Sequence, residues 1–155
     1  MADWVINGLL LIRKGCRMNS DKWLDECYCF CDGFGIVVLN GKYNLINKEG
    51  RLLSSTWLDK CFKFREGFGV VRLNGKWNYI DKDGRLLSST WLDYCSNFVE
   101  GFGRVLLNGK ENYIGNDGKY LSDVWLDECW NFSEGFAAVM LNGKWSYIDK
   151  EGRLA

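Results

Sequence analysis

Short apolar runs alternate with polar turn residues along the whole chain. Val and Phe dominate residues 68–73, Asn74-Gly75 follows, and a second run with Trp, Tyr and Ile occupies residues 76–80. Two β-prone runs around Asn-Gly predict a β-hairpin, because a type I′ turn needs φ > 0 at both central residues. Asp83-Gly84 marks a second turn, and Arg85–Ser88 is expected to form a third strand. We therefore predict a three-stranded antiparallel meander.

The register of the hairpin follows from its turn. With Asn74-Gly75 as the loop, Val70 faces Tyr79 and Arg72 faces Trp77 across the two strands. Both faces of this hairpin are largely apolar. We expect both faces to be covered, as happens when one repeat stacks on the next.

A different spacing marks the segment that begins at Trp57. Trp57, Cys61 and Phe64 fall at i, i+4 and i+7, and Thr56 before them is a candidate helix cap. This spacing predicts a short helical or irregular turn. Because free cysteine is among the most buried residue types, we also predict a recurring core position. It is occupied by Cys27, Cys61, Cys95 and Cys129.

The same pattern recurs every 34 residues without insertion. Trp-Leu-Asp begins at Trp23, Trp57, Trp91 and Trp125, and Leu-Asn-Gly-Lys begins at Leu39, Leu73, Leu107 and Leu141. We predict a single repeat domain over residues 1–155. It consists of a partial N-terminal unit at 1–22, repeats at 23–56, 57–90 and 91–124, and a truncated repeat at 125–155.

This organisation predicts an all-β repeat protein of five antiparallel hairpin or meander units. An open twisted array is the favoured arrangement. A closed toroid of five units is the alternative, since five hairpins could bring residues 4–12 near residues 141–148.

The repeated residues resemble the WG repeat, which is also called the KWG repeat. In one copy they read Phe-x-Glu-Gly-Phe from Phe64, then Val-x-Leu-Asn-Gly-Lys-Trp-Asn-Tyr-Ile-Asp-Lys-Asp-Gly from Val71. The resemblance implies a β-rich module that mediates interactions, with no common enzymatic activity. One feature departs from the family: the glycine after the tryptophan is replaced by Asn44, Asn78, Asn112 and Ser146.

The composition removes several classes of function. The chain has no histidine, which excludes a Ser/His/Asp triad, a Cys/His pair and a His-ligated metal. Lys+Arg and Asp+Glu are 20 each, so the net charge is zero and no bulk nucleic-acid binding is expected. No carboxylate pair stands out from the repeat, and no phosphate-loop motif occurs. We expect no enzyme activity, no cofactor and no resident metal.

The seven cysteines do not indicate a disulfide framework, because their number is odd and the N-terminal residues lack a signal-peptide pattern. The longest apolar run near them, Leu9–Ile12, is too short to cross a bilayer. We expect a cytoplasmic protein with reduced cysteines. Cys29 and Cys31 follow Cys27 at a spacing that is atypical of zinc sites, so a metal or redox role is only an alternative.

Departures from the repeat mark candidate binding residues. Arg104 replaces an apolar residue of the other copies, and Glu111 replaces an aromatic one. Arg104 should face Tyr113 and lie diagonal to Glu111, which predicts either an ion pair or a polar site for an anionic or planar ligand. Arg72 opposite Trp77 predicts a cross-strand cation–π pair or a similar site. The complete candidate set is Arg72, Trp77, Arg104, Glu111, Tyr113 and Trp145.

The first hairpin is unusually apolar. Leu9 and Leu11 stand where later copies have lysine and asparagine. Terminal repeats normally keep a polar outer side, so we expect this hairpin to be covered. Packing on the second unit, ring closure, a partner protein and a second copy of the chain are the alternatives.

These features predict a non-catalytic interaction module that presents a repeated aromatic and polar surface to a protein partner. The alternative is capture of a small anionic, nucleotide-like or carbohydrate ligand in a groove or central pocket. Carbohydrate would stack on exposed tryptophan.

Overall fold

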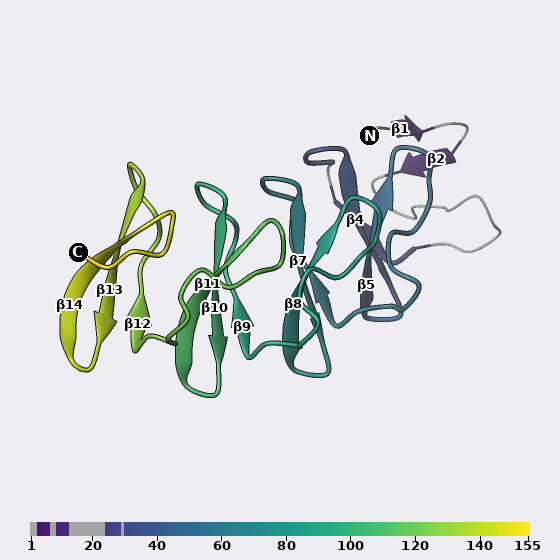
Figure 1. The fold of residues 1–155 in the computed structure, drawn as a ribbon. Coiled ribbons are helices and arrows are strands. Elements are labelled where there is room, and N and C mark those ends of the chain that lie inside the picture. The colour runs from purple at the N-terminus through teal and green to yellow at the C-terminus, as the bar shows by residue number, and fades with distance from the viewer. Residues whose placement is uncertain (1–2, 7–8, 13–23, 29) are drawn as a thin grey trace. The chain divides into compact units, whose positions relative to one another are not determined.

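The chain folds into antiparallel β-sheets (Figure 1). The computed structural model describes residues 3–6, 9–12, 24–28 and 30–155. Among these residues there is no helix, and so none that could cross a membrane. The all-β prediction is therefore confirmed.

Four three-stranded sheets follow one another along the chain. Their strands are β3 (Glu26–Cys27), β4 (Phe34–Leu39) and β5 (Lys42–Asn47); β6 (Lys60–Cys61), β7 (Phe68–Leu73) and β8 (Lys76–Asp81); β9 (Tyr94–Cys95), β10 (Phe102–Leu107) and β11 (Lys110–Gly115); and β12 (Glu128–Cys129), β13 (Phe136–Leu141) and β14 (Lys144–Asp149). A two-stranded sheet, β1 (Asp3–Ile6) with β2 (Leu9–Ile12), precedes them.

Contacts between Cα atoms divide the chain into two compact units. The first contains Met1–Gly75 and Ile80–Arg85, and the second contains Lys76–Tyr79 and Leu86–Ala155. The boundary thus falls within β8.

The hairpins have the register that the sequence predicts. In the third sheet Arg104 pairs with Tyr113 and Leu106 with Glu111. The hairpins β4–β5 and β13–β14 show the equivalent pairs. Asn108 and Gly109 in the connecting turn have φ of 52° and 77°, as a type I′ turn requires.

The sequence predicts a helical or irregular turn at each junction, and the structure shows the irregular alternative, with no helix among the described residues of this segment. Leu58 exchanges two main-chain hydrogen bonds with Tyr43, with N···O distances of 2.7 and 2.8 Å. Lys60 and Cys61 then pair with β7. The chain bends between these two pairings, so strict strand alternation fails and Leu58, Cys61 and Phe64 are all buried. Pairing with neighbouring strands therefore overrides the helical spacing.

The third strand of each sheet comes from the other side of the hairpin than predicted. It is the two-residue strand that precedes the hairpin, such as β9, which pairs with β10. The segment after the hairpin forms only an isolated bridge, as between Tyr120 and Ile114. The meander prediction is corrected accordingly.

An asparagine side chain takes over part of the pairing that the predicted third strand would have made. Asn112 is fully buried, and its Nδ2 donates to the main-chain oxygen of Ser122 at 2.9 Å. Its Oδ1 accepts from the main-chain N–H of Ser122 at 3.1 Å and of Tyr113 at 2.8 Å. Asn44 and Asn78 make the same bonds, so the residue that departs from the family pattern clips the following loop to the hairpin.

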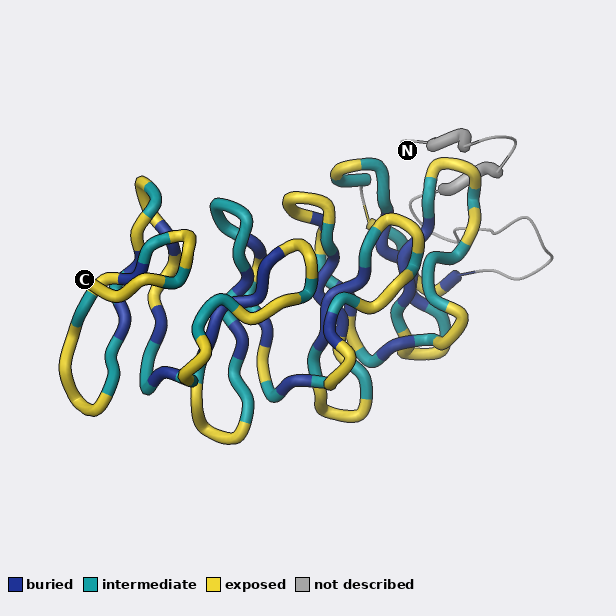
Figure 2. The backbone as a smooth tube through the Cα atoms, viewed as in Figure 1, coloured by how far each residue is buried: buried dark blue, intermediate teal, exposed yellow. Residues whose placement is uncertain are grey.

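Both faces of each inner hairpin are buried, as expected for stacked repeats (Figure 2). In the third sheet Val105 and Ile114 lie on one face and Tyr113 on the other, and all three are at most 1% exposed. Gly118 shows how closely successive repeats approach. It has φ of 80°, and a Cβ there would lie 2.8 Å from the main-chain oxygen of Leu87.

The recurring cysteine occupies the core in three repeats. Cys27, at the same position of the first repeat, is only half-buried and forms a disulfide, so the expectation of reduced cysteines is wrong at this residue. Cys61, Cys95 and Cys129 are free thiols with at most 2% exposure. Burial raises the pKa of each thiol to about 12. A thiol with so high a pKa is a poor nucleophile at neutral pH, which supports the packing interpretation of this position.

The N-terminal hairpin pairs in the same register as the later ones, with Ile6 opposite Leu9 and Trp4 opposite Leu11. The side chains of Leu9 and Leu11 lie outside the described part of the chain, as do Cys16, Trp23 and Cys29. The prediction of a partner surface there, like the count of five units with a partial N-terminal one, stays a prediction.

Candidate functional site

Arg104 and Glu111 hold one residue of the following repeat. Arg104 Nη1 donates to the main-chain oxygen of Cys129 at 2.8 Å. Glu111 Oε2 accepts from the main-chain N–H of the same Cys129 at 2.5 Å. The predicted ion pair between these two side chains is therefore replaced by a clamp on β12. The charged side chains of Arg104 and Glu111 thus connect the third repeat to the fourth.

Tyr113 lies in the same junction. It is 1% exposed, and its hydroxyl donates to the main-chain oxygen of Trp130 at 2.5 Å. Its ring packs edge-on against Phe132 at 4.9 Å, and Phe102 stacks on that phenylalanine from the other strand at 4.9 Å. Burial raises the pKa of Tyr113, which keeps the hydroxyl protonated as a donor.

The preceding junction in the second unit repeats this geometry. The hydroxyl of Tyr79 donates to the main-chain oxygen of Ser96 at 2.5 Å, and its ring meets Phe98 edge-on at 4.9 Å. Trp77 exchanges two main-chain hydrogen bonds with Leu92 and contacts Tyr94 edge-on at 5.3 Å. Trp77 therefore belongs to the repeat junction. Arg72, in the first unit, is exposed and pairs through its main chain with Lys60.

A lysine–aspartate pair reinforces each described junction. Lys42 Nζ lies 2.5 Å from a carboxylate oxygen of Asp59, and the same pairing joins Lys76 to Asp93 and Lys110 to Asp127. The other carboxylate oxygen of Asp59 accepts from the main-chain N–H of Asn74 at 2.7 Å. The hydrogen bond from lysine, followed by this main-chain bond, lowers the pKa of Asp59, Asp93 and Asp127.

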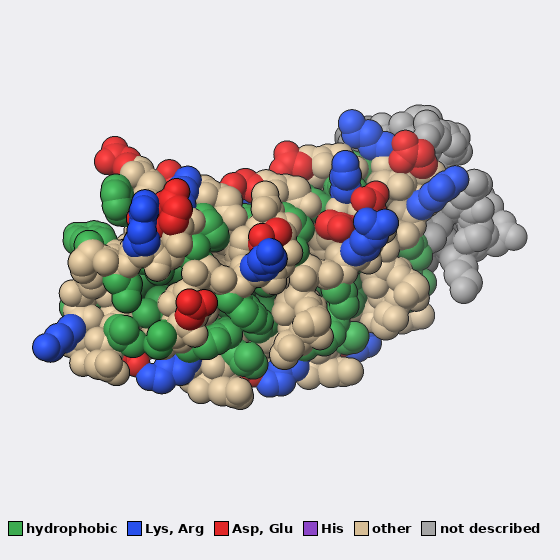
Figure 3. All heavy atoms as spheres, viewed as in Figure 1, with side chains coloured by type: hydrophobic (Ala, Val, Ile, Leu, Met, Phe, Trp, Pro, Cys, Tyr) green, Lys and Arg blue, Asp and Glu red, His purple; other side chains and the backbone are tan. Residues whose placement is uncertain are grey.

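No residue in the described part of the chain covers the corresponding surface of the fourth repeat. We call the side of this sheet that carries Phe136, Ala138, Trp145 and Tyr147 the β14 face. The three aromatic side chains are 55%, 50% and 59% exposed, respectively. Their counterparts one repeat earlier are Phe102, Glu111 and Tyr113, which contact the next repeat. Figure 3 shows hydrophobic side chains reaching the surface where Figure 1 places β13 and β14.

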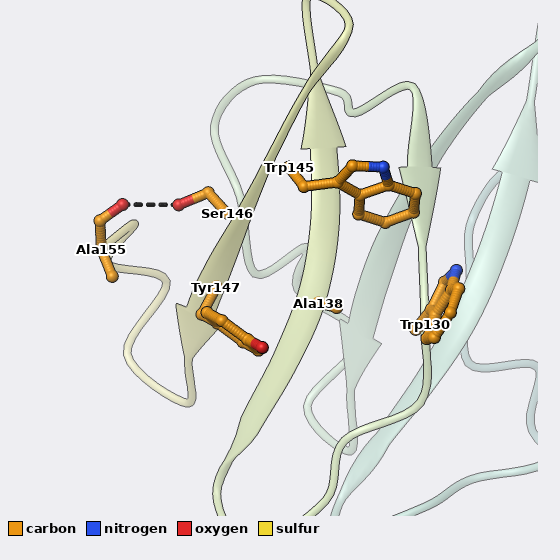
Figure 4. A pocket seen from close by; sticks show the side chains of 6 residues that line it. All are labelled: Trp130, Ala138, Trp145, Ser146, Tyr147 and Ala155. Carbon is orange, nitrogen blue, oxygen red and sulfur yellow. Dashed lines mark hydrogen bonds between the residues drawn. The ribbon is translucent and has the colours of Figure 1, made fainter.

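A cavity of about 630 Å³ opens on the β14 face. It is lined by Trp130, Ala138, Trp145, Ser146, Tyr147 and Ala155. Figure 4 shows Trp145 and Tyr147 projecting from one side of β14, whereas Ser146 turns toward Ala155, to which its hydroxyl donates. Trp130 meets Trp145 edge-on at 5.5 Å. The lining is aromatic, with no charged side chain.

The sequence named Trp145 as a candidate but missed most of this surface. Phe136, Tyr147 and Trp130 occupy repeated or weakly constrained positions, so nothing in their own pattern distinguishes them from core residues. The available signal was the 34-residue repeat itself, because each junction residue of an inner copy has a counterpart in the fourth copy.

The described residues offer no cluster of three or more Cys, Asp or Glu side chains suited to a metal ion. Cys31 is half-buried, and its thiol lies 3.9 Å from the main-chain oxygen of Phe64. Cys29, the other residue of the atypical cysteine motif, lies outside the described residues.

A comparison with known protein families identifies the family to which the chain belongs. The family described as "WG containing repeat" matches residues 45–77, 79–110 and 113–145, which together cover more than half of the sequence. The chain therefore belongs to the WG-repeat family. No curated protein sequence matches it.

Solved structures show weak likenesses. KlHsv2 with loop 6CD replaced by a Gly-Ser linker has 11% identity and a TM-score of 0.44 over 79% of this chain and 47% of that one. Kluyvelomyces marxianus Hsv2 has 15% identity and a TM-score of 0.40 over 83% and 49%. A Bacteroides caccae protein of unknown function has 12% identity and a TM-score of 0.31 over 83% and 66%. The chain spans about half the length of the first two proteins.

Proposed function

We propose that this chain is a non-catalytic module that binds a protein partner through the β14 face. The observation that carries the proposal is the exposure of Phe136, Trp145 and Tyr147, whose counterparts in the inner repeats contact the next repeat. Exposed aromatic clusters of this kind are typical of protein-interaction surfaces. Membership in a family of β-repeat modules is consistent with this function.

The test is partner capture from the source cells with the tagged chain and with Trp145→Ala and Tyr147→Ala variants. Both side chains are at least half exposed, so we expect either variant to keep its fold and thermal stability. We expect a specific partner to be retained by the parent chain and lost, at least tenfold, from both variants.

Val124→Ala is the matched control, because Val124 is 56% exposed and lies outside the β14 face. It should capture the partner as well as the parent chain does. A partner that all four proteins retain equally would show that another surface binds, and the absence of any specific partner would refute the proposal.

Capture of a small planar ligand is the second candidate, favoured by the cavity of about 630 Å³ with Trp130, Trp145 and Tyr147 in its lining. Aromatic walls suit sugar rings and nucleobases. A thermal-shift screen with sugars and nucleotides tests it. A ligand of this site raises the melting temperature of the parent chain and of Val124→Ala but not of Trp145→Ala. If none of these compounds does so, this second candidate fails.

A further inference from the structure

The partner chemistry can be read from what fills the equivalent face in the inner repeats. We propose that the β14 face accepts an extended segment of a partner chain in which Leu-Asp is followed, six residues after the leucine, by phenylalanine. This inference rests on the proposed protein-binding function and specifies its partner. It is carried by three features: the edge of β14, a lysine beside it, and the aromatic pocket.

The edge of β14 offers one unused pair of main-chain groups. In three inner hairpins the residue at this position exchanges two hydrogen bonds with a leucine: Tyr43 with Leu58, Trp77 with Leu92, and Glu111 with Leu126, at 2.7–2.8 Å. Trp145 is the equivalent residue, and β14 is the last strand in its sheet. No described residue makes this pair with Trp145. An open strand edge of this kind binds extended peptides by adding a short strand.

A lysine lies beside that edge, where it would favour an aspartate directly after the leucine of the bound segment. In the inner repeats the aspartate that follows the leucine pairs with the lysine after the turn, as in the Lys110–Asp127 pair. Lys144 is the corresponding lysine. It is exposed, and no carboxylate in the described part of the chain lies within ion-pair distance. An aspartate in the bound segment would complete the pair.

The aromatic pocket accounts for the phenylalanine. Six residues after each junction leucine stands Phe64, Phe98 or Phe132. Phe132 lies between Phe102 and Tyr113, with ring centroids 4.9 Å from both. Phe136 and Tyr147 are the counterparts of those two rings. By analogy, the hydroxyl of Tyr147 would donate to a main-chain oxygen of the bound segment, as that of Tyr113 does to Trp130.

One inner junction matches the β14 face more closely than the others and supplies the probe. Strand β14 differs from β8 at a single position, Ser146 in place of Asn78. The segment that packs on Trp77 and Tyr79 contains Leu92, Asp93, Tyr94 and Phe98. A synthetic peptide with the sequence of residues 89–100 therefore carries every group that the β14 face would recognise.

The experiment measures binding of this peptide, fluorescently labelled and kept reduced, to the 155-residue chain by anisotropy. We expect saturable binding. Peptides with Leu92→Lys or Phe98→Ala should each bind at least about tenfold more weakly, because burying either side chain contributes more free energy than one decade of Kd. An Asp93→Asn peptide should lose affinity mainly at low salt.

The chain variant Tyr147→Lys should abolish binding, whereas Val124→Lys, at a similarly exposed position, should bind like the parent chain. Unchanged melting temperatures would show that both variants are folded. The inference is overturned if the peptide does not bind. It is also overturned if the Kd is unchanged by substitution of Leu92 and Phe98 in the peptide and of Tyr147 in the chain.

Two further outcomes separate this inference from the proposed function. If the peptide fails to bind while capture of a cellular partner depends on Tyr147, the binding module stands and the Leu-Asp/Phe segment is wrong. If sedimentation shows that the chain dimerises and that Tyr147→Lys makes it monomeric, a second copy occupies the face, which also overturns the inference.

Discussion

At the level of single residues, the Glu-Gly turns hold a glutamate in a strained backbone conformation with positive φ. Glu66, Glu100 and Glu134 have φ between 49° and 52°, each before a glycine with positive φ. These pairs form a second two-residue turn, closed by bridges such as Ser133 with Phe136. The left-handed region disfavours a residue with an ordinary side chain, whereas asparagine tolerates it.

Replacing Glu134 by asparagine should stabilise the chain. Glu134 is exposed and has φ of 52°. We expect Glu134→Asn to raise the free energy of unfolding by about 0.5–1 kcal/mol, because asparagine adopts this conformation with less strain. Urea unfolding measures the change. Glu134→Ala is the control, since it removes the carboxylate but keeps the strain; an equal gain in both variants would show that the charge, not φ, is responsible.

At the level of the element, the hairpins that carry Asn44, Asn78 and Asn112 each have a buried asparagine clip. Asn112 satisfies both main-chain groups of Ser122 and the N–H of Tyr113. This clip explains why the segment after the hairpin needs only one isolated bridge to stay in place. The buried amide is well paired, so its removal would leave main-chain groups without partners.

We expect Asn112→Ala to lower the free energy of unfolding by about 2–4 kcal/mol, because each unsatisfied buried group costs about 1–3 kcal/mol. Thermal unfolding monitored by circular dichroism checks this. Asn116→Ala, at an exposed position four residues along, should change stability by less than about 0.5 kcal/mol. Similar losses in both variants would show that the clip is unimportant.

At the level of the whole molecule, one ion pair per junction recurs within each unit. Lys42–Asp59 belongs to the first unit, and Lys76–Asp93 and Lys110–Asp127 belong to the second. The lysine bond lowers the pKa of each aspartate in the folded chain below its ordinary value of 3.8. Each aspartate therefore binds its proton more readily in the unfolded chain.

The sign of the pH dependence follows from this difference. The stabilisation is fully present well above pH 3.8 and is lost as the pH falls through the lower, folded pKa values. We expect the urea midpoint to drop steeply below about pH 4, and Asp93→Asn to be less steep than the parent chain. High salt should reduce the effect, because these pairs are exposed. If the urea midpoint of Asp93→Asn falls with pH as steeply as that of the parent chain, the Lys76–Asp93 pair does not contribute to the pH dependence of stability.

The hairpins and the period at which they recur follow from the amino-acid sequence alone. The Asn-Gly turns predicted a register that β10–β11 and its counterparts follow, because a two-residue loop fixes the pairing of every following residue. It also predicted the buried cysteines Cys61, Cys95 and Cys129, since a small apolar residue recurred at one position. These features are local in sequence or periodic, and the recurrence of the same residues in each copy strengthens the pattern that predicts them.

The conformation of the segments between the hairpins depends instead on contacts in the folded chain. The Leu-Asp segment has helical spacing, yet it forms no helix because Leu58 pairs with Tyr43 of the preceding hairpin and Lys60 with Arg72 of the following one. Arg104 and Glu111 stood out as polar exceptions, but their shared target, the Cys129 main chain, lies in the next repeat. The same long-range packing makes Tyr113 a core residue and its repeat counterpart Tyr147 a surface residue. A residue's role is therefore set by whether another repeat covers it.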